Sequence, residues 1–443
     1  MTKRHRYALL SAFVALVVAL SVTVLIRSAA GEGTSGSSAT GRRPHGSSAA
    51  PASAGTWVGS WAASPVGAEP GTEATGLAGR SVRNVVHANT GGTSARVTLS
   101  NLYGQAPLTI THASVALSAG RGTAAARAET MRRLTFDGAY AVTIPAGEQV
   151  LSDAVRIAVP HDSDVLVTTY AADPSGPVTY HPHARQISYV AEGDRTEEST
   201  GVPYAEQTTF WRYVTALDVL SNEAHGTIVV FGDSITDGIS STTGENHRWT
   251  DVLASRLRSA DGHGSLAPRY SVVNEGISGN RVLTDGLGRP AENPSGLSRF
   301  GRDALGHANV KVVVIDLGIN DILHAQAPGD QAKILDGLRA LVRQAHARGL
   351  KVVGATLTPF ERRRGWTPAR EVMRRQINTE IRSGRVFDAV VDFDSALKDP
   401  AAPQRLAAAY DSGDHLHPSD LGYRKMAEVF NLRLLAGAGQ AEL

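Results

Sequence analysis

The sequence predicts an α/β domain built on a doubly wound parallel sheet of about five strands, preceded by an antiparallel β-sandwich domain. From about Gly226 onward, near-continuous apolar runs alternate with segments of helical period, as expected of strands that are covered on both faces. Between Trp57 and about Asp218, shorter segments alternate apolar and polar residues between turns rich in Gly, Pro, Asn and Asp. Such segments are typical of antiparallel strands with one buried face.

The predicted organisation has four parts: residues 1–27, a membrane anchor or signal peptide; residues 28–55, a linker; residues 56–222, the β-sandwich domain; and residues 223–443, the α/β domain. The linker is rich in Gly, Ser and Ala and has almost no large apolar residue. Because it cannot bury apolar surface to offset the entropy lost on ordering, we expect it to be flexible.

The first part indicates where the protein acts. Basic residues at its start precede an uncharged run, rich in Leu, Val and Ala, from Tyr7 to Ile26. A membrane span needs about 20 residues, whereas the apolar region of a signal peptide usually has about 7–15. The run has the spanning length, but the SAA sequence at Ser28–Ala30 also suits cleavage. We therefore expect either a retained anchor or a cleaved signal peptide, with the rest of the protein outside the cytoplasm.

The β-sandwich domain is predicted from segments with a period of two residues and no interrupting helical segment of useful length. The clearest segments are Ser94–Gly104, Ala141–Pro160 and Ser163–Asp173. Trp57, Trp61 and Tyr103 are candidates for stacking on sugars, although aromatic residues in β-domains more often pack in the core or on the sheet.

In the α/β domain the predicted strands and helices alternate along the chain. The strands are 226–234, 270–278, 310–321, 350–359 and 389–397, and the helices are 246–259, 330–348, 368–383 and 419–435. Ligands of such sheets bind where the parallel strands end. Polar residues at those ends are therefore the candidates for function.

Composition excludes several classes of function. The formal net charge is +2 and no long basic run occurs, so nucleic acid is not an expected partner. The absence of cysteine excludes disulfides, thiol catalysis, thiolate zinc sites and iron–sulfur clusters.

The first predicted strand ends in VVFGDSITDG, which presents Ser234 between two aspartates. A serine hydroxyl becomes a good nucleophile only when a base takes its proton, and a serine after a strand is also a common helix N-cap. The G-x-S-x-G elbow occurs nowhere in the chain, which argues against an α/β-hydrolase of the usual lipase kind.

The next two predicted strands end in NEGISGN and LGIND. Gly276 and Gly279 allow close backbone approach, and the N–H of Gly279 is a candidate donor to an oxyanion. Asn320 offers a side-chain amide at the same edge, although a lone Asn is more often a turn residue. Asp321 is a candidate for holding that loop.

Near the C-terminus, DSGDHLHPSD supplies a candidate base. His417 precedes a predicted helix, and Asp414 lies three residues earlier, within reach of the imidazole through a single turn. His415 is the rival base. These residues also suggest a metal, but a third ligand at suitable spacing is missing, so no metal is expected.

The blocks GDSITDG, NEGISGN, LGIND and DHLHP together resemble the motifs of the SGNH, or GDSL-type, serine hydrolases, over about Gly226 to Leu435. The resemblance implies a flavodoxin-like α/β fold and no cofactor. It implies Ser234 as nucleophile, His417 as base and Asp414 as the residue that orients it. The oxyanion hole would be formed by the N–H groups of Ser234 and Gly279 and the side-chain amide of Asn320. The serine block reads GDSI here instead of GDSL.

The segment from Trp57 to Asp218 resembles, more loosely, the β-domain that precedes the hydrolase domain in some bacterial SGNH proteins. We expect hydrolysis of small-molecule or polysaccharide esters with short acyl groups, such as O-acetyl groups. A lipase or phospholipase and a non-catalytic glycan-binding surface protein are the alternatives. The loop Thr284–Gly296 matches no block and is a candidate wall of the substrate pocket.

Overall fold

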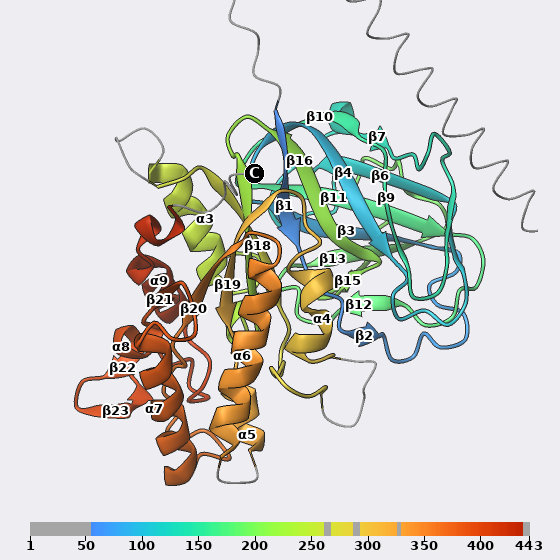
Figure 1. Ribbon diagram of the computed structural model, residues 1–443. Helices are drawn as coiled ribbons and strands as arrows, with labels where there is room; N and C mark the ends of the chain where they lie inside the picture. The colour runs from blue at the N-terminus through green and yellow to red at the C-terminus, as the bar shows by residue number, and fades with distance from the viewer. Residues whose placement is uncertain (1–54, 261–266, 287–292, 326–328, 437–443) are drawn as a thin grey trace, which may run out of the picture. The chain divides into compact units, whose positions relative to one another are not determined.

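The computed structural model describes residues 55–260, 267–286, 293–325 and 329–436 (Figure 1). The predicted apolar run Tyr7–Ile26 and nearly all of the predicted linker lie outside this part of the chain. Within the described residues, no helix combines the length and the apolar character that crossing a membrane requires.

Two antiparallel sheets form the N-terminal part, as predicted. One runs in the order β1-β16-β4-β10, with β9 beside β4. Its strands are β1 (Thr56–Ala62), β4 (Gly92–Ser100), β9 (Gln149–Leu151), β10 (Val155–Val159) and β16 (Val214–Ser221). The other runs β14-β13-β3-β11-β6-β7. Its strands are β3 (Arg80–Ala88), β6 (His112–Leu117), β7 (Arg132–Arg133), β11 (Ser163–Ala171), β13 (Ser188–Glu192) and β14 (Glu206–Thr208).

The two sheets face each other across one apolar core. Val97 and Leu217 of the first sheet pack with Val86 and Val167 of the second, and all four are fully buried. Shorter pairings extend the sandwich: β15-β12-β2 and β5-β8. Their strands are β2 (Gly67–Ala68), β5 (Leu108–Ile110), β8 (Val142–Ile144), β12 (Thr179–His181) and β15 (Trp211–Arg212), and a short 3₁₀ turn, η1, spans Ala128–Thr130.

A parallel sheet follows, in the order β18-β17-β19-β20-β21. Its strands are β17 (Gly226–Gly232), β18 (Tyr270–Gly276), β19 (Val310–Asp316), β20 (Lys351–Ala355) and β21 (Ala389–Val391). The first of these five strands in chain order, β17, lies between the second, β18, and the third, β19. The carboxyl ends of β17 and β19 therefore flank the point where the connections diverge, which is the usual ligand-binding edge.

Helices cover this sheet on both faces, and the alternation along β17 explains why. Ile228 and Val230 face one core, shared with α3 and α9, whereas Val229 and Phe231 face another, shared with α4, α6 and α7. The helices are α2 (Ser234–Asp237), α3 (Trp249–Ala260), α4 (Gly296–Asp303), α5 (Ile319–His324), α6 (Asp330–His346), α7 (Pro368–Arg382), α8 (Phe393–Leu397) and α9 (Asp420–Val429).

Several boundaries differ from the predictions. The apolar run predicted as a strand over 389–397 leaves the sheet after β21, because Asp392 caps α8 by accepting a hydrogen bond from Ser395 N at 3.1 Å. The run predicted over 310–321 ends at Asp316, and α5 begins three residues later. The last helix ends at Val429, followed by the 3₁₀ turn η2 (Leu432–Leu435). Helix α4 and the hairpin of β22 (Lys398–Asp399) and β23 (Ala402–Leu406) were not predicted.

The sandwich packs directly against the edge of the parallel sheet, where β1 lies beside β18 (Figure 1). Gly59 N on β1 donates to Thr227 Oγ1 at 3.0 Å. A side chain at Gly59 would meet Val273 at 2.9 Å, so only glycine permits this approach. Ala62 of β1 joins the apolar core that contains Val273.

Candidate active site

Ser234 sits where β17 turns into the short helix α2. Asp233 caps the turn, since its carboxylate accepts from Ile235 N at 3.0 Å. The turn is tight: a side chain at Gly232 would meet Thr236 Oγ1 at 2.4 Å, and Gly238 ends the turn with φ of 91°. The glycines of the GDSITDG block therefore serve the backbone path that presents Ser234.

The structure brings Ser234, His417 and Asp414 together. Ser234 Oγ and His417 Nε2 are 2.8 Å apart, and His417 Nδ1 lies 2.6 Å from Asp414 Oδ2. Because a carboxylate oxygen only accepts, Nδ1 carries the hydrogen, which leaves Nε2 free to accept from the serine. Ser234 and His417 are 4% and 8% exposed. The arrangement is a serine next to a buried, correctly oriented base.

Asp414 is itself held in place by its neighbours. Its Oδ1 accepts from Leu416 N at 3.0 Å and from His417 N at 2.8 Å. Partial burial acts to raise the pKa of Asp414, but the hydrogen bonds from His417 and Leu416 outweigh it and hold this pKa well below its usual range. Asp414 therefore remains an anion opposite the imidazole.

His415, the rival base, is engaged elsewhere. Its Nδ1 lies 2.7 Å from Asp411 Oδ2, and its backbone adopts φ of 66°. Asp411 also accepts from His415 N and from Gly413 N. This pair braces the turn that carries His417.

The segment Ile277–Asn280, here called the oxyanion loop, lies against the Ser234 turn. Ile277 N donates to Gly232 O at 3.1 Å. A side chain at Gly276 would come within 2.2 Å of Asp237 N, so the end of β18 touches the backbone of α2. Gly279 is exposed and has φ of 77°, a conformation that favours glycine.

Asn320 is tied to this loop. It lies in the first turn of α5, is 7% exposed, and its Nδ2 donates to Asn280 O at 3.0 Å. A side-chain amide has a second hydrogen for another acceptor. Asn320 and Gly279 thus stand at the same strand-end edge as Ser234, with Asn320 bonded to the residue that follows Gly279.

Asp321 holds the chain that follows the oxyanion loop. Its two carboxylate oxygens accept from Val282 N at 2.8 Å and Leu283 N at 3.1 Å. Burial raises the pKa of Asp321 to about 6, against the lowering effect of these two hydrogen bonds. It thus holds the backbone of Val282 and Leu283, and not the LGIND loop for which it was a candidate.

Arg299 is a central residue of the site's support that the sequence analysis did not identify. It is fully buried, and its guanidinium donates to Gly232 O at 2.9 Å, Glu275 O at 2.9 Å and Asn280 Oδ1 at 3.0 Å. It thus joins the ends of β17 and β18 to the oxyanion loop. No signal in the sequence marked it, because α4 was not predicted and its partners at the ends of β18 and β17 lie 24 and 67 positions away in the chain.

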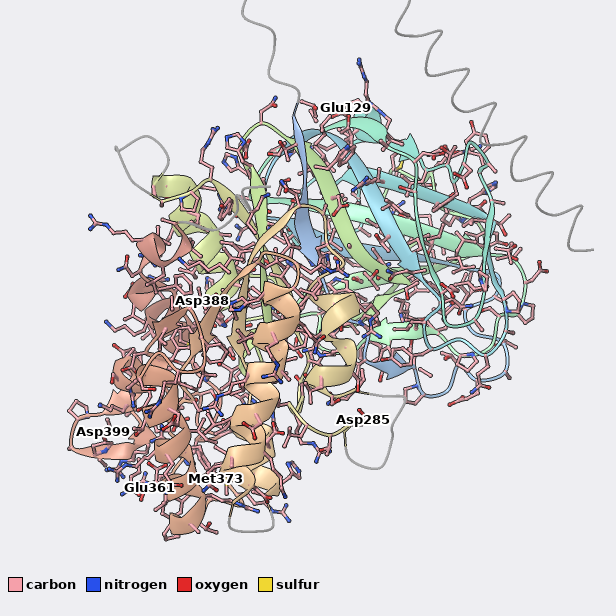
Figure 2. All side chains as sticks on the ribbon, in the orientation of Figure 1. Glu129, Asp285, Glu361, Met373, Asp388 and Asp399 are labelled. Carbon is pink, nitrogen blue, oxygen red and sulfur yellow. The ribbon has the colours of Figure 1, made fainter. Side chains whose placement is uncertain are left out.

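The loop Thr284–Gly296, which matched no motif, is closed at its base. Gly286 N donates to Asn293 O at 2.9 Å, and Asp285, which is labelled in Figure 2, accepts from Ser295 N at 2.8 Å. Residues 287–292 lie outside the described part of the chain.

Two of the three aromatic candidates for sugar stacking, Trp61 and Trp57, pack against other side chains. Trp61 is only 7% exposed and meets Trp211 edge-on, with ring centroids 4.8 Å apart. The guanidinium of Arg96 covers the ring of Trp57 at 4.5 Å. Tyr103 is partly buried, and burial raises the pKa of its hydroxyl.

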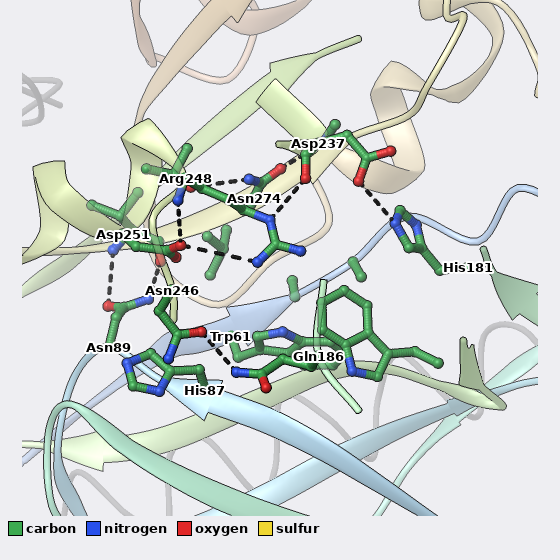
Figure 3. Close-up of a pocket in the computed structure, with 17 residues that line it drawn as sticks. Trp61, His87, Asn89, His181, Gln186, Asp237, Asn246, Arg248, Asp251 and Asn274 are labelled. Carbon is green, nitrogen blue, oxygen red and sulfur yellow. Dashed lines mark hydrogen bonds and ion pairs between the residues drawn. The ribbon is translucent and has the colours of Figure 1, made fainter. Parts of the chain in front are cut away.

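A small cavity lies behind the site, between β1 and β12 of the sandwich and the parallel sheet (Figure 3). Its volume is about 30 Å³, and its lining includes Trp61, His181, Asp237 and Gly276. That volume suits about two water molecules and no organic substrate. Across the residues that the structure describes, His, Asp and Glu side chains form no group of three or more that could hold a metal ion.

Comparisons with known proteins bear on the same region. Residues 230–425 match the model of the GDSL-like Lipase/Acylhydrolase family, a range that includes Ser234, Gly279, Asn320, Asp414 and His417. The resemblance seen in the sequence is thereby confirmed. In a comparison with curated proteins, no sequence matches the chain.

Solved structures with a similar fold include a carbohydrate acetylesterase family member from Sinorhizobium meliloti. It is 18% identical, with 48% of this chain and 100% of that chain covered and a TM-score of 0.37. Another, from Desulfitobacterium hafniense DCB-2, is assigned to the lipolytic G-D-S-L family. It is 21% identical, with 47% of this chain and 99% of that chain covered and a TM-score of 0.36.

Proposed function

We propose that this chain is a carboxylic ester hydrolase, in which Ser234 is the nucleophile and His417 the base; the match of residues 230–425 to the GDSL-like lipase/acylhydrolase family supports this. The observation that carries the proposal is the 2.8 Å hydrogen bond between Ser234 Oγ and His417 Nε2. Asp414, on the other ring nitrogen, orients the base and stabilises the imidazolium that forms when His417 accepts a proton.

The reaction proceeds through an acyl-enzyme. His417 Nε2 takes the hydroxyl proton as Ser234 Oγ bonds to the ester carbonyl carbon, whose π electrons move onto the oxygen. The tetrahedral intermediate then collapses, and the leaving alcohol receives the proton from His417. A water molecule, deprotonated by His417, attacks the acyl group, and the acid leaves as Ser234 regains its hydrogen.

The oxyanion is stabilised by the N–H groups of Ser234 and Gly279 and the side-chain amide of Asn320. The bond from Asn320 to Asn280 O and the contact between the oxyanion loop and the Ser234 turn support this assignment. Loss of one such donor typically costs about 2.7–4 kcal/mol of transition-state stabilisation.

We propose esters with short acyl groups as substrates, including O-acetyl groups on carbohydrate. A lipase needs a contiguous apolar surface near its site. Among the described residues, the large apolar side chains that are well exposed belong to separate segments: Tyr140, Leu151, Val202, Val372 and Leu421. This distribution favours a small, polar substrate over a lipid aggregate.

We also propose that the enzyme acts outside the cytoplasm, attached to a membrane by an uncleaved N-terminal segment or released after cleavage. The length of the uncharged run Tyr7–Ile26 and the basic residues before it support this location. Fractionation of expressing cells, with N-terminal sequencing of the product, distinguishes an anchored from a cleaved form; a full-length product in the cytosol would contradict the proposal.

The proposed function is tested with p-nitrophenyl esters of increasing chain length and with acetylated xylan. The wild type is expected to hydrolyse acetyl and butyryl esters fastest, and Ser234→Ala to be close to inactive. Asn320→Ala is expected to fold and to lose about 10²–10³ in kcat. A maximum at long acyl chains would replace the short-acyl proposal with a lipase, and equal rates for wild type and Ser234→Ala would remove Ser234 as nucleophile.

A further inference from the structure

We propose that the β-sandwich contributes to the active site, because its residue His181 positions the oxyanion loop through Asp237 of the hydrolase domain. The inference rests on the proposed function, because it assigns that loop to the same reaction. His181 is a positioning residue, since it acts on Ser278 and Gly279 through another side chain.

His181 is the last residue of β12, and its imidazole lies between the two parts of the molecule (Figure 3). Its Nδ1 faces Ser64 O at 2.8 Å, and its Nε2 faces Asp237 Oδ1 at 3.1 Å. Carbonyl and carboxylate oxygens only accept hydrogen bonds, so both ring nitrogens donate when Asp237 is ionised. The contact between His181 and Asp237 is buried, with side chains 3% and 2% exposed.

Asp237 carries this contact to the oxyanion loop. Its second oxygen, Oδ2, accepts from Ser278 N at 3.1 Å and from Ser278 Oγ at 2.7 Å. Burial acts to raise the pKa of Asp237, but His181, His183 and Ser278 outweigh it and lower this pKa, so the carboxylate is an anion. One carboxylate therefore links a histidine of the sandwich to the residue immediately before Gly279.

The same carboxylate belongs to the Ser234 turn. Asp237 is the last residue of α2, and its backbone N donates to Asp233 O at 2.8 Å. Its position relative to Ser234 is thus fixed by one turn of helix. The His181–Asp237 pair therefore sets the distance between the oxyanion loop and Ser234. This distance determines whether the loop's N–H groups can stabilise a tetrahedral intermediate.

A second connection reaches the loop from the opposite side. Val66 O of the sandwich accepts from Asn293 N at 2.6 Å. Asn293 Nδ2 in turn donates to Ser278 O at 2.8 Å, and Asn293 Oδ1 accepts from Asn280 Nδ2 at 2.7 Å. Asp237 therefore holds the backbone N–H of Ser278, and Asn293 holds its carbonyl oxygen. Both of these residues are themselves hydrogen-bonded to the sandwich.

The alternative is that these contacts merely hold two domains together. Other contacts do so without touching the loop: Gln186 Nε2, five residues beyond His181, donates to Asn246 Oδ1 at 2.7 Å (Figure 3). Among the residues that the structure describes, neither Gln186 nor Asn246 is hydrogen-bonded to the oxyanion loop, so this pair supplies the matched control. Loss of Gln186 should weaken the junction, whereas loss of His181 should also release Asp237 and the loop.

The test compares His181→Phe, His181→Gln and Gln186→Ala in the full chain. Phe keeps an aromatic ring beside Trp211, whose ring centroid is 5.5 Å from that of His181, but removes both donors. We expect His181→Phe to lower kcat about 10- to 100-fold on p-nitrophenyl acetate, less than the loss of an oxyanion donor, with KM nearly unchanged. Gln, which retains a donor, should recover most of the loss. Gln186→Ala should lower only the melting temperature.

Hydrogen–deuterium exchange supplies a readout that does not depend on turnover. Exchange of the peptide that contains residues 277–280 should rise in His181→Phe and not in Gln186→Ala. If His181→Phe does not fold, Ser278→Ala is the second variant, because it removes one bond to Asp237 from the hydrolase side; it should lower kcat and raise exchange in the same peptide.

The outcomes separate cleanly. A His181→Phe enzyme with wild-type kcat and unchanged loop exchange, or a folded Ser278→Ala enzyme with both unchanged, overturns the positioning role and leaves the proposed function intact. If the wild type is no faster than Ser234→Ala, the proposed function fails, and the exchange of residues 277–280 alone decides whether His181 positions the loop.

Discussion

Asp414 and Asp411 make similar contacts with different histidines, which allows a sharp test of their roles. Asp414 bonds the ring that touches Ser234, whereas Asp411 bonds the ring of His415. We predict that Asp414→Asn lowers kcat by about 10³–10⁴, because an amide next to Nδ1 no longer enforces the productive tautomer. Asp411→Asn, the control, should lower kcat far less than Asp414→Asn does, since Asp411 contacts the ring of His415 and affects His417 only through the turn that it braces. Steady-state kinetics decide; the reverse pattern would make His415 the base.

The raised pKa of Asp321 predicts that its contribution to the free energy of unfolding decreases as the pH rises, the opposite of the usual behaviour of a carboxylate in a folded protein. Its pKa is about 6 in the folded protein, above the ordinary value of about 3.9 expected after unfolding. The folded state therefore binds more protons between these values, and this group's stabilising contribution is lost as the pH rises through them. The free energy of unfolding of the wild type, relative to Asp321→Asn, should fall by up to about 3 kcal/mol from pH 4 to 7.

Urea unfolding of the two proteins across this range measures the difference. The comparison cancels the other titrating groups, because both proteins contain them. A free energy of unfolding of the wild type that, relative to that of Asp321→Asn, stays constant or increases as the pH rises would contradict the raised pKa of Asp321.

At the scale of elements, the closest contact in the site is between the end of β18 and helix α2. A side chain at Gly276 would lie 2.2 Å from Asp237 N and 2.7 Å from its Cα. We predict that Gly276→Ala destabilises the protein by about 1–3 kcal/mol and lowers kcat, because the two elements must separate. Gly301→Ala in α4 is the control: nothing lies within 4 Å of the added atom. That change should stabilise by about 0.5–1 kcal/mol. Equal stability for both variants would refute the close contact.

The sequence predicted the long elements better than the short ones. Helices α6 and α7 follow the predicted ranges to within two residues at either end, because several turns of apolar period and a capping Thr367 define them. The strand-like run at 389–397 was wrong beyond Val391, since a short apolar run has no period that separates helix from strand. The hydrogen bond by which Asp392 caps α8 determines where the strand β21 ends.

At the scale of the whole molecule, the site residues that lie in short sequence motifs could be predicted. The long-range contacts that support them could not. Ser234, Gly279, Asn320 and the Asp414–His417 pair lie in short motifs at predicted strand ends and in the last loop. The residues that support them are separated by much of the chain: the contact from Arg299 to Ser64 spans 235 positions. No period or spacing links such partners, so only the folded structure identifies them.

The junction between the sandwich and the parallel sheet could not be predicted for the same reason, because its contacts also join residues that are distant in the sequence. Its polar contacts, such as the pair of His181 and Asp237, join side chains 56 positions apart. The strand β12 was not predicted from the sequence, and a histidine at the end of a three-residue strand carries no signal of a distant partner. The proposed role of the sandwich in the site therefore rests on the fold, whereas the proposal of Ser234 as nucleophile rests first on the motifs.

The most direct test of the account is covalent labelling with a fluorophosphonate, located by peptide mass spectrometry. The account predicts a single adduct, on the hydroxyl of Ser234, and a much slower reaction when His417 is replaced by Ala, because the imidazole activates that hydroxyl. A folded wild-type protein that takes no label, or takes it on another residue, would contradict the central claim that Ser234 and His417 act together.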